Sequence, residues 1–338
     1  MSSDLPEHWA YFRGDFVPLD KANVNISTHA FNYGTAVFEG IRAYWNPRHE
    51  QLYVLQLLAH CRRLLSSAKL LQMQLPYTDA QLADLVLELL RRDNVREDVY
   101  VRPIVYKSSE LVGVRLHDLD CDLAMFATPF GSYIDVERGI RTMVSTWRRV
   151  DDNAIPARGK ITGAYVNSAL AKSEAMANGF DEAIMLGSDG HVSEGSAENI
   201  FIVREGILIT PPVSDNILEG ITRRELIKMA RSLSIEVVER SIDRTELYAA
   251  DEIFLCGTGA QISAVVEVDR RMVGRGQPGP LTYQLSKLYF AAVHGELDRY
   301  RHWLTPVYAL ASAHTTSDAI LEPPIALDVA AAARDDNA

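Results

Sequence analysis

Apolar positions recur along the chain with two different periods. Between Leu57 and Leu71, and again between Leu82 and Leu89, they return at intervals of three and four residues. That spacing places a single buried stripe on an amphipathic helix. With the turn and capping residues around similar segments, the pattern predicts helices over residues 57–71, 78–92, 165–178 and 280–297, a helix beginning at Gly220, and a short helix at 244–249.

Short runs rich in β-branched and aromatic residues separate these helices and indicate strands. Pro103 lies inside one such run and has no N–H to donate, so we expect its strand to lie at a sheet edge or to bend there. Mixed strands and helices predict an α/β protein of the α+β type. The predicted strands span residues 8–12, 16–19, 52–55, 98–107, 121–128, 140–147, 182–186, 199–203, 207–210, 235–239, 252–256 and 262–268.

A chain of 338 residues is long enough for two domains. A short segment with a proline, small residues and two aromatics, Pro129–Tyr133, is typical of a connection between domains. Beyond Pro306 the composition changes to Ala, Ser, Thr and Pro with little apolar periodicity. We therefore predict a smaller N-terminal α/β domain (1–128), an interdomain loop (129–139), a larger C-terminal domain (140–306) and a poorly ordered tail (307–338).

Composition narrows the class of protein. Hydrophobic residues make up 47% of the chain and charged residues 23%, as in globular proteins, and the net charge of −11 argues against a nucleic-acid or anionic-membrane surface. Three cysteines lie far apart, which predicts reduced thiols and neither a disulfide framework nor a zinc site. The N-terminus has no secretion pattern and no apolar run is long enough to span a bilayer, so the expected location is the cytoplasm.

Two residues are the main candidates for chemistry. Lys160 lies in a turn-prone segment with Pro156, Gly159 and Gly163, just before a predicted helix. Glu194 follows a turn at 187–190 and precedes a strand. A lysine that forms a Schiff base and an acid that holds a pyridinium nitrogen are what pyridoxal phosphate chemistry requires. Taken alone, these residues favour the plainer alternatives, a solvated lysine and a surface turn, because short motifs of this kind are common.

Two segments of the second half are candidate anion sites. At Gly220-Ile221-Thr222 a helix begins with free backbone N–H groups, and Thr222 and Glu225 have the spacing of a capping box. Gly257-Thr258-Gly259-Ala260 follows a strand and combines small residues with a hydroxyl. A plain cap and a plain turn remain the alternatives. Neither segment matches the dinucleotide fingerprint, and Lys160 lacks the surroundings of a P-loop lysine.

Together the motifs resemble the class IV (fold type IV) aminotransferases, specifically the branched-chain amino acid aminotransferases. The resemblance covers roughly residues 8–306, with the motifs in the same order and spacing. They are Tyr33-Gly-Thr-Ala-Val-Phe38-Glu-Gly, Tyr100-Val-Arg102-Pro103, Lys160 with Tyr165, Ser193-Glu194-Gly195 through Glu198-Asn199, Gly220-Ile221-Thr222-Arg223, and Gly257-Thr258.

The resemblance implies pyridoxal 5'-phosphate as cofactor, bound where two α/β domains meet. Lys160 would hold it covalently and move the α-proton of the substrate, while Glu194 would pair with the ring nitrogen and Tyr165 with the phenolic oxygen. Four further residues would hold the phosphate, namely Arg63, Ile221, Thr222 and Thr258. Arg63 lies off the apolar stripe of its helix, so the pattern alone would leave it solvated.

The resemblance also implies a substrate pocket. Tyr33, Phe38 and Tyr133 would form an apolar wall, with Phe130 at its rim, where related proteins often carry tryptophan. Arg102 with Tyr100 would bind the side-chain carboxylate of glutamate, although an internal ion pair is the alternative for Arg102. The loop of Thr258, Gly259 and Ala260 would bind the substrate's α-carboxylate.

The implied reaction is a ping-pong transamination by a homodimer or larger homo-oligomer. L-leucine, L-isoleucine or L-valine would give its amino group to the cofactor, and 2-oxoglutarate would take it to become L-glutamate. Three alternatives stay open. They are a D-amino acid or (R)-amine aminotransferase, an aminodeoxychorismate lyase, and a non-enzymatic protein that has kept the fold.

Overall fold

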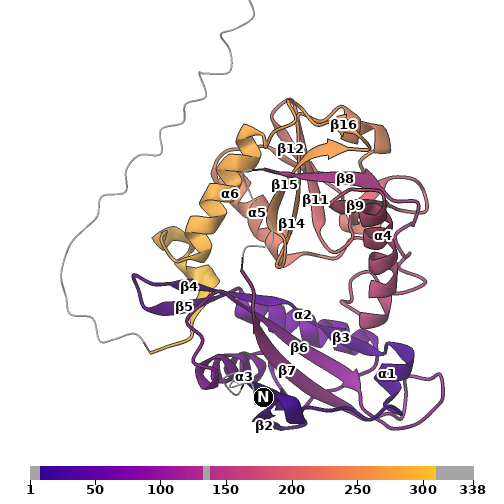
Figure 1. Cartoon of the computed structure of the whole chain (residues 1–338), viewed down its shortest axis with the longest axis vertical. Helices are drawn as coiled ribbons and strands as arrows, with labels where there is room; N and C mark the ends of the chain where they lie inside the picture. Colours follow the sequence, from indigo (N-terminus) through magenta and orange to yellow (C-terminus); the bar gives the residue numbers. More distant parts are fainter. Residues whose placement is uncertain (1–7, 132–137, 310–338) are drawn as a thin grey trace, which may run out of the picture. The chain divides into compact units, whose positions relative to one another are not determined.

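The computed structural model describes residues 8–131 and 138–309, which form two β-sheets with helices packed against them (Figure 1). In the first sheet the order is β17-β5-β4-β6-β7-β1-β2, and β3 also pairs with β6. Its strands are β1 (Trp9–Phe12), β2 (Asp15–Pro18), β3 (Ala36–Phe38), β4 (Ile41–Asn46), β5 (Gln51–Leu55), β6 (Val99–Lys107), β7 (Cys121–Pro129) and β17 (Leu304–Pro306).

The position of β6 corrects one expectation. This strand holds Pro103, yet it lies inside the sheet, between β7 on one side and β3 and β4 on the other, so the edge alternative is wrong. Pro103 accepts a hydrogen bond at its carbonyl from the N–H of Glu39, which lies in the two-residue break between β3 and β4. Because the backbone polar groups of one residue point to the same side of an antiparallel strand, the missing N–H faces that break, where no regular ladder bond is lost.

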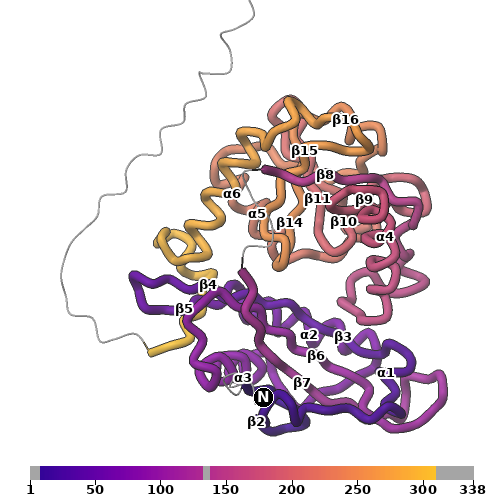
Figure 2. Tube along the Cα trace, in the orientation of Figure 1, coloured from indigo at the N-terminus to yellow at the C-terminus, as the bar shows by residue number. Residues whose placement is uncertain are grey.

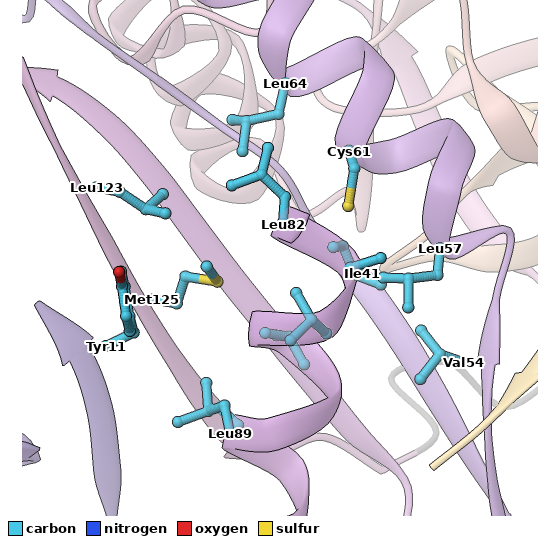
Figure 3. Close-up of a cluster of buried hydrophobic side chains, with 14 of the residues drawn as sticks. Tyr11, Ile41, Val54, Leu57, Cys61, Leu64, Leu82, Leu89, Leu123 and Met125 are labelled. Carbon is cyan, nitrogen blue, oxygen red and sulfur yellow. The ribbon is translucent and has the colours of Figure 1, made fainter. Parts of the chain in front are cut away.

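Two helices, α2 (Leu57–Leu70) and α3 (Asp79–Arg92), pack on the first sheet. Thr78 caps α3 through a capping box with Gln81, as a helix beginning at Thr78-Asp79 requires. Figure 3 shows side chains of α2, α3 and β7 converging in this core. The apolar stripes recognised in the sequence form the buried faces of both helices, with Leu57, Leu64, Leu82 and Leu89 at 1% exposure or less, whereas Leu58 is 43% exposed.

The second sheet has the order β10-β9-β8-β15-β14-β11-β12-β13, and β16 pairs with β15. Its strands are β8 (Ile140–Val144), β9 (Glu182–Leu186), β10 (Val192–Gly195), β11 (Asn199–Arg204), β12 (Ile207–Thr210), β13 (Val237–Glu239), β14 (Glu252–Gly257), β15 (Gln261–Val268) and β16 (Arg271–Met272). Its helices are α4 (Tyr165–Ala177), α5 (Ile221–Ser232) and α6 (Pro280–Val293). The helix predicted over 280–297 stops early because Gly295, at φ 75°, turns the chain left-handed just after it.

Short elements complete the described fold. They are α1 (His29–Tyr33) and the 3₁₀ turns η1 (Leu19–Lys21), η2 (Thr162–Ala164), η3 (Val213–Asp215), η4 (Arg244–Tyr248) and η5 (Asp298–Trp303). Figure 2 follows the chain out of the first sheet after β7 and back to it at its yellow end, where β17 pairs with β5. Val307 is fully buried in the first core, so the ordered fold continues a little past Pro306.

The fold is thus a two-domain α/β arrangement of mixed sheets and helices. The domain limits at 128, 139 and 306 stay predictions. The prediction of a poorly ordered tail falls on residues 310–338, which lie outside the described residues.

Candidate active site

One pocket gathers residues from both sheets, and it encloses about 1050 Å³, part of which is open to solvent. It contains most of the residues that the sequence singled out. Those that line it are Phe38, Arg63, Tyr100, Arg102, Lys160, Tyr165, Glu194, Ile221, Thr222, Thr258, Gly259 and Ala260.

Lys160 is held by its backbone on the first sheet. Its N–H donates to Ser67 Oγ on α2 (3.1 Å), and its carbonyl accepts from the N–H of Phe38 on β3 (3.0 Å). The backbone thus anchors Lys160, and its side chain points into the pocket, where Nζ donates to the Tyr165 hydroxyl over 2.7 Å. A half-buried amine placed next to a phenol is a suitable nucleophile and proton carrier.

Two glycines allow this anchoring. Gly34 adopts φ 65°, and a Cβ on it would lie 2.8 Å from the Cα of Gly163, so a larger residue cannot fit there. The close approach lets Thr162 Oγ1 donate to the carbonyls of Gly34 (2.8 Å) and Ala36 (3.0 Å). The turn-prone composition around Lys160 therefore serves contact between two backbones.

Glu194 lies on β10, at an end strand of the second sheet, and its side chain is buried. A register shift between Val192 and Glu194 marks a β-bulge, a device that redirects side chains. Oε1 lies 2.9 Å from Arg149 Nε, while Oε2 accepts from the N–H of Leu218 (3.1 Å) and from Asn199 Nδ2 (3.2 Å). Burial raises the pKa of the Glu194 carboxyl above its usual value, although Arg149 opposes the rise.

The candidate phosphate site lies at the start of α5. The helix begins at Ile221 with Gly220 as N-cap, and no side chain caps it. The expected capping box of Thr222 and Glu225 is therefore wrong: both lie inside the helix, and Glu225 pairs instead with Arg224 and Lys228. Because the first N–H groups are not used by a cap, they remain available to an anion in the pocket.

The loop after β14 meets the other candidate binding residues. Thr258, Gly259 and Ala260 line the pocket, and the Gly259 carbonyl accepts from Arg42 Nη1 over 3.3 Å. Arg42 is fully buried and also donates to the carbonyls of Phe130 (2.6 Å) and Gly131 (2.8 Å). One arginine of β4 thus holds the loop and the start of the interdomain segment together.

Arg102 extends into the pocket from β6. Its Nη2 donates to the Tyr100 hydroxyl (2.9 Å), and its guanidinium lies 4.3 Å from the centre of the Phe38 ring. A Cβ at Gly40 would lie 2.0 Å from the Tyr100 oxygen, so this glycine provides the space for that hydroxyl. Within residues 8–131 and 138–309, no carboxylate forms an ion pair with Arg102.

Three aromatic residues that were expected to form the substrate pocket, Tyr33, Phe130 and Tyr133, have different outcomes. Tyr33 does not line the pocket, and its hydroxyl accepts from the N–H of Gly113 over 3.1 Å. Phe130 packs its ring 5.3 Å from that of Tyr100. Tyr133 lies outside the described residues. The structure therefore places Phe38 and Tyr100, but not Tyr33, on the pocket wall.

Several residues of the site escaped sequence reasoning. Arg149 and Asn199 flank Glu194, Ser67 anchors Lys160, and Arg42 holds the loop after β14. Arg149, Ser67 and Arg42 lie far from their partners in the chain, so no local pattern could pair them. Asn199 lies in the recognised motif of Glu194, five residues away, and its amide could have suggested a donor to that carboxylate.

Two classes of site find no support in the described residues. No group of three or more His, Cys, Asp or Glu side chains there could hold a metal ion. In the same part of the chain, none of the helices is long and apolar enough to cross a membrane.

Comparison with known proteins gives consistent matches. A family model described as amino-transferase class IV matches residues 36–268. A probable branched-chain-amino-acid aminotransferase of Aquifex aeolicus is 52% identical over 301 residues, which is 89% of this chain and 97% of the relative.

Solved structures are similar as well. The branched-chain aminotransferase of Thermoproteus uzoniensis, solved with norvaline, superposes with a TM-score of 0.86 at 46% identity, covering 89% of this chain and all of that one. The branched-chain amino acid aminotransferase of Thermobaculum terrenum, solved in its PLP form, also reaches 0.86, at 38% identity, with 90% of this chain and 99% of that chain covered.

Proposed function

Because the chain belongs to the class IV aminotransferases, and within them to the branched-chain-amino-acid aminotransferases, we propose that it transfers amino groups from L-leucine, L-isoleucine and L-valine to 2-oxoglutarate. The products are the branched-chain 2-oxo acids and L-glutamate. The enzyme is an aminotransferase, and its cofactor is pyridoxal 5'-phosphate. The co-substrate and the roles of individual residues are the proposed part.

The residues of the pocket fit this cofactor. A lysine amine beside a phenol suits its aldehyde and phenolic oxygen, and a buried carboxylate suits its ring nitrogen. An arginine and an uncapped helix N-terminus suit its phosphate. When bound, the cofactor supplies an aldehyde that condenses with amines and a ring that withdraws electrons from the substrate's α-carbon.

The protein's own groups then divide the work. Lys160 Nζ would hold the cofactor and, as a free amine, would take the substrate's α-proton and return it one position away. Tyr165, 2.7 Å from Nζ, orients that amine. Glu194 would keep a proton on the ring nitrogen of the cofactor. The buried, negatively charged carboxylate of Glu194 is stabilised by a cation next to it, and the protonated ring nitrogen is such a cation. The N–H groups near Thr258 and Ala260 orient the substrate's α-carboxylate.

Arg102 carries the proposal for 2-oxoglutarate. One pocket must accept both an aliphatic side chain and a carboxylate. Phe38 supplies an apolar wall, and the guanidinium over it has no carboxylate partner in the described residues. Its charge is therefore available to a longer, acidic substrate.

A half-reaction tests the reaction class. Purified holoenzyme without any 2-oxo acid is mixed separately with L-leucine, D-alanine and (R)-1-phenylethylamine while the cofactor's visible absorption band is followed. We expect L-leucine alone to remove the band, and Lys160→Ala to abolish the change. Removal by D-alanine or the amine would assign the protein to the alternative aminotransferases, and release of pyruvate without an acceptor would indicate the lyase.

Arg102→Met tests the co-substrate. We expect KM for 2-oxoglutarate to rise about tenfold or more, since a charge-assisted contact is lost. KM for 4-methyl-2-oxopentanoate, which has no second carboxylate, should change less than about threefold. An equal change for both acceptors would contradict the assignment.

We also propose that the protein is a homodimer or larger homo-oligomer in the cytoplasm. An exposed apolar surface supports self-association. Two of its residues are Ile26 (80% exposed) and Phe31 (69%), and two more are Val112 (83%) and Val114 (89%). The contact of His29 Nε2 with the Gly113 carbonyl, at 2.9 Å, brings these two segments of the chain together. Light scattering should show the oligomer and a shift toward monomer in Phe31→Glu; a monomeric wild type would refute it. The three free cysteines support a reducing compartment.

A further inference from the structure

A buried charge cluster lies beneath the candidate phosphate site. Glu39 is in the two-residue break between β3 and β4, and its side chain is fully buried. It accepts from Arg63 Nε (2.6 Å) and Nη2 (2.9 Å), and its Oε2 lies 2.8 Å from His60 Nδ1. We propose that Glu39 and His60 are positioning residues that aim the Arg63 guanidinium at the phosphate of the cofactor.

The local fold explains how the three side chains meet. His60 and Arg63 are three residues apart on α2, so they share one face of that helix. That face lies against the break between β3 and β4, which the N–H of Glu39 stabilises by donating to the Pro103 carbonyl (2.9 Å). The carboxylate therefore enters between the two side chains from the segment that joins β3 and β4.

The cluster is charged in a defined way. Burial favours the neutral form of Glu39, but Arg63 and His60 outweigh it and hold the pKa of this carboxyl below its usual value. Burial lowers the pKa of His60 below its usual value despite the nearby carboxylate. His60 is thus neutral at pH 7, with Nδ1–H donating to the charged Glu39. The two contacts with Glu39 fix the orientation of the Arg63 guanidinium, and with it the direction of its remaining N–H donors.

Arg63 keeps donors for a ligand. Of its five N–H groups, Nε–H and one on Nη2 face Glu39, and one on Nη1 faces the Glu219 carbonyl (3.1 Å). One N–H on each terminal nitrogen remains. Glu219 comes just before Gly220, the N-cap of α5, so this contact places the free donors beside the helix N-terminus.

The pairing also divides the electrostatic task. Since Glu39 already balances the charge of Arg63, the guanidinium offers a phosphate directed N–H donors more than net charge, and the N-terminus of α5 supplies the field. Glu39 should therefore matter for a phosphorylated ligand and much less for the same ring without phosphate. This inference rests on the proposed role of Arg63 as a phosphate ligand.

Cofactor affinity tests the inference. Apoenzymes of the wild type, Glu39→Gln, Arg63→Gln and Arg62→Gln are titrated with pyridoxal 5'-phosphate and with pyridoxal by equilibrium dialysis. Glu39→Gln should weaken binding of the phosphorylated form about tenfold or more, because a glutamine amide cannot hold both guanidinium donors, and should change pyridoxal less than about threefold. Arg62, 67% exposed and paired with Asp79, is the matched control that should change neither.

The outcomes separate the two assignments. If Arg63→Gln loses the preference for phosphate and Glu39→Gln keeps it, the role of Glu39 is refuted while that of Arg63 stands. If Arg63→Gln weakens both ligands equally or neither, Arg63 is not the phosphate ligand, and both assignments fall. Should Glu39→Gln fail to fold, His60→Gln decides: a smaller loss confined to the phosphorylated ligand supports the proposal, and an equal loss for both overturns it.

Discussion

Glu39 and Glu194 are both buried carboxylates beside an arginine, one at the first sheet and one on the second, yet their pKa values move in opposite directions. Burial raises the pKa in both cases. At Glu39 a two-pronged arginine and a histidine, at 2.6 to 2.9 Å, overcome it. At Glu194 a single arginine nitrogen and two neutral donors, at 2.9 to 3.2 Å, do not.

The difference in pKa distinguishes Glu39, a carboxylate with a structural role, from Glu194, a carboxylate that can still bind a cation. The negative charge of Glu39 is already balanced by Arg63, so the role of Glu39 is to hold the side chains of Arg63 and His60 in place. The charge of Glu194 is only partly compensated, so a further cation against it is stabilised. A protonated ring nitrogen is such a cation, which is why the less satisfied carboxylate is the one suited to the cofactor ring.

The largest expected effect is on stability at Glu39. Removing one partner of a buried ion pair costs about 3–5 kcal/mol because the other charge is left buried. Glu39→Gln should lower the unfolding free energy of the apoenzyme by about that amount, measured by urea denaturation at pH 7. A loss below about 1 kcal/mol would show that Glu39 is not the closed, structural partner described above.

The reverse pattern is expected at Glu194. Glu194→Gln removes the charge that holds a proton on the ring nitrogen, so kcat should fall about 100-fold or more, as for other positioned charges in active sites. Its cost in stability should be under half that of Glu39→Gln, since burial already disfavours this charge. Glu205→Gln, at an exposed turn, serves as the carboxyl-to-amide control. Equal losses of kcat in both would contradict the assignment.

A smaller effect is expected at Arg149. Arg149→Gln removes the cation that opposes the rise in the Glu194 pKa, so that pKa should rise further. The acidic limb of the kcat profile should move to higher pH, by one unit for each ~1.4 kcal/mol of interaction that is lost. Arg148→Gln changes an exposed neighbour and should leave the profile in place. A lower kcat with an unmoved profile would count against this electrostatic role.

The smallest effect is a contrast in pH dependence. A carboxyl whose pKa is lower in the folded protein than in the unfolded chain stabilises the fold at pH values above its unfolded pKa, and this stabilisation is lost as the pH falls. Glu39, whose usual pKa is 4.5, is this case. A raised folded pKa has the opposite sign, so Glu194 loses stability as pH rises above 4.5 through its folded pKa.

Urea denaturation of the apoenzymes between pH 4 and pH 8 measures this contrast. Relative to the wild type, the deficit of Glu39→Gln should shrink below about pH 4.5, and that of Glu194→Gln should shrink above it, by at most about 1.4 kcal/mol per pH unit. Parallel pH dependences for the two variants would remove the distinction between the two carboxylates.

Local sequence determined much of this protein. The stripes from Leu57 and Leu82 form the predicted helices, because one buried face needs only a period that the chain itself carries. Lys160, Tyr165 and Thr258 were found as candidates because glycines and short motifs mark them, and the structure brings them into one pocket. The family resemblance was confirmed by the class IV family model, which matches residues 36–268, and by a relative that is 52% identical over 301 residues.

Tertiary structure alone decided the rest. Pro103 was expected to lie in an edge strand or at a bend, because the sequence cannot show that its missing N–H faces a break between two other strands. Thr222 and Glu225 had the spacing of a capping box, yet both lie inside the helix, and Glu225 pairs with Arg224 and Lys228. The burial of Glu39 and Glu194, and the partners that move their pKa values apart, depend on contacts between residues distant in the chain. Spacing cannot encode them, because desolvation and ion pairing arise only when separate elements pack together.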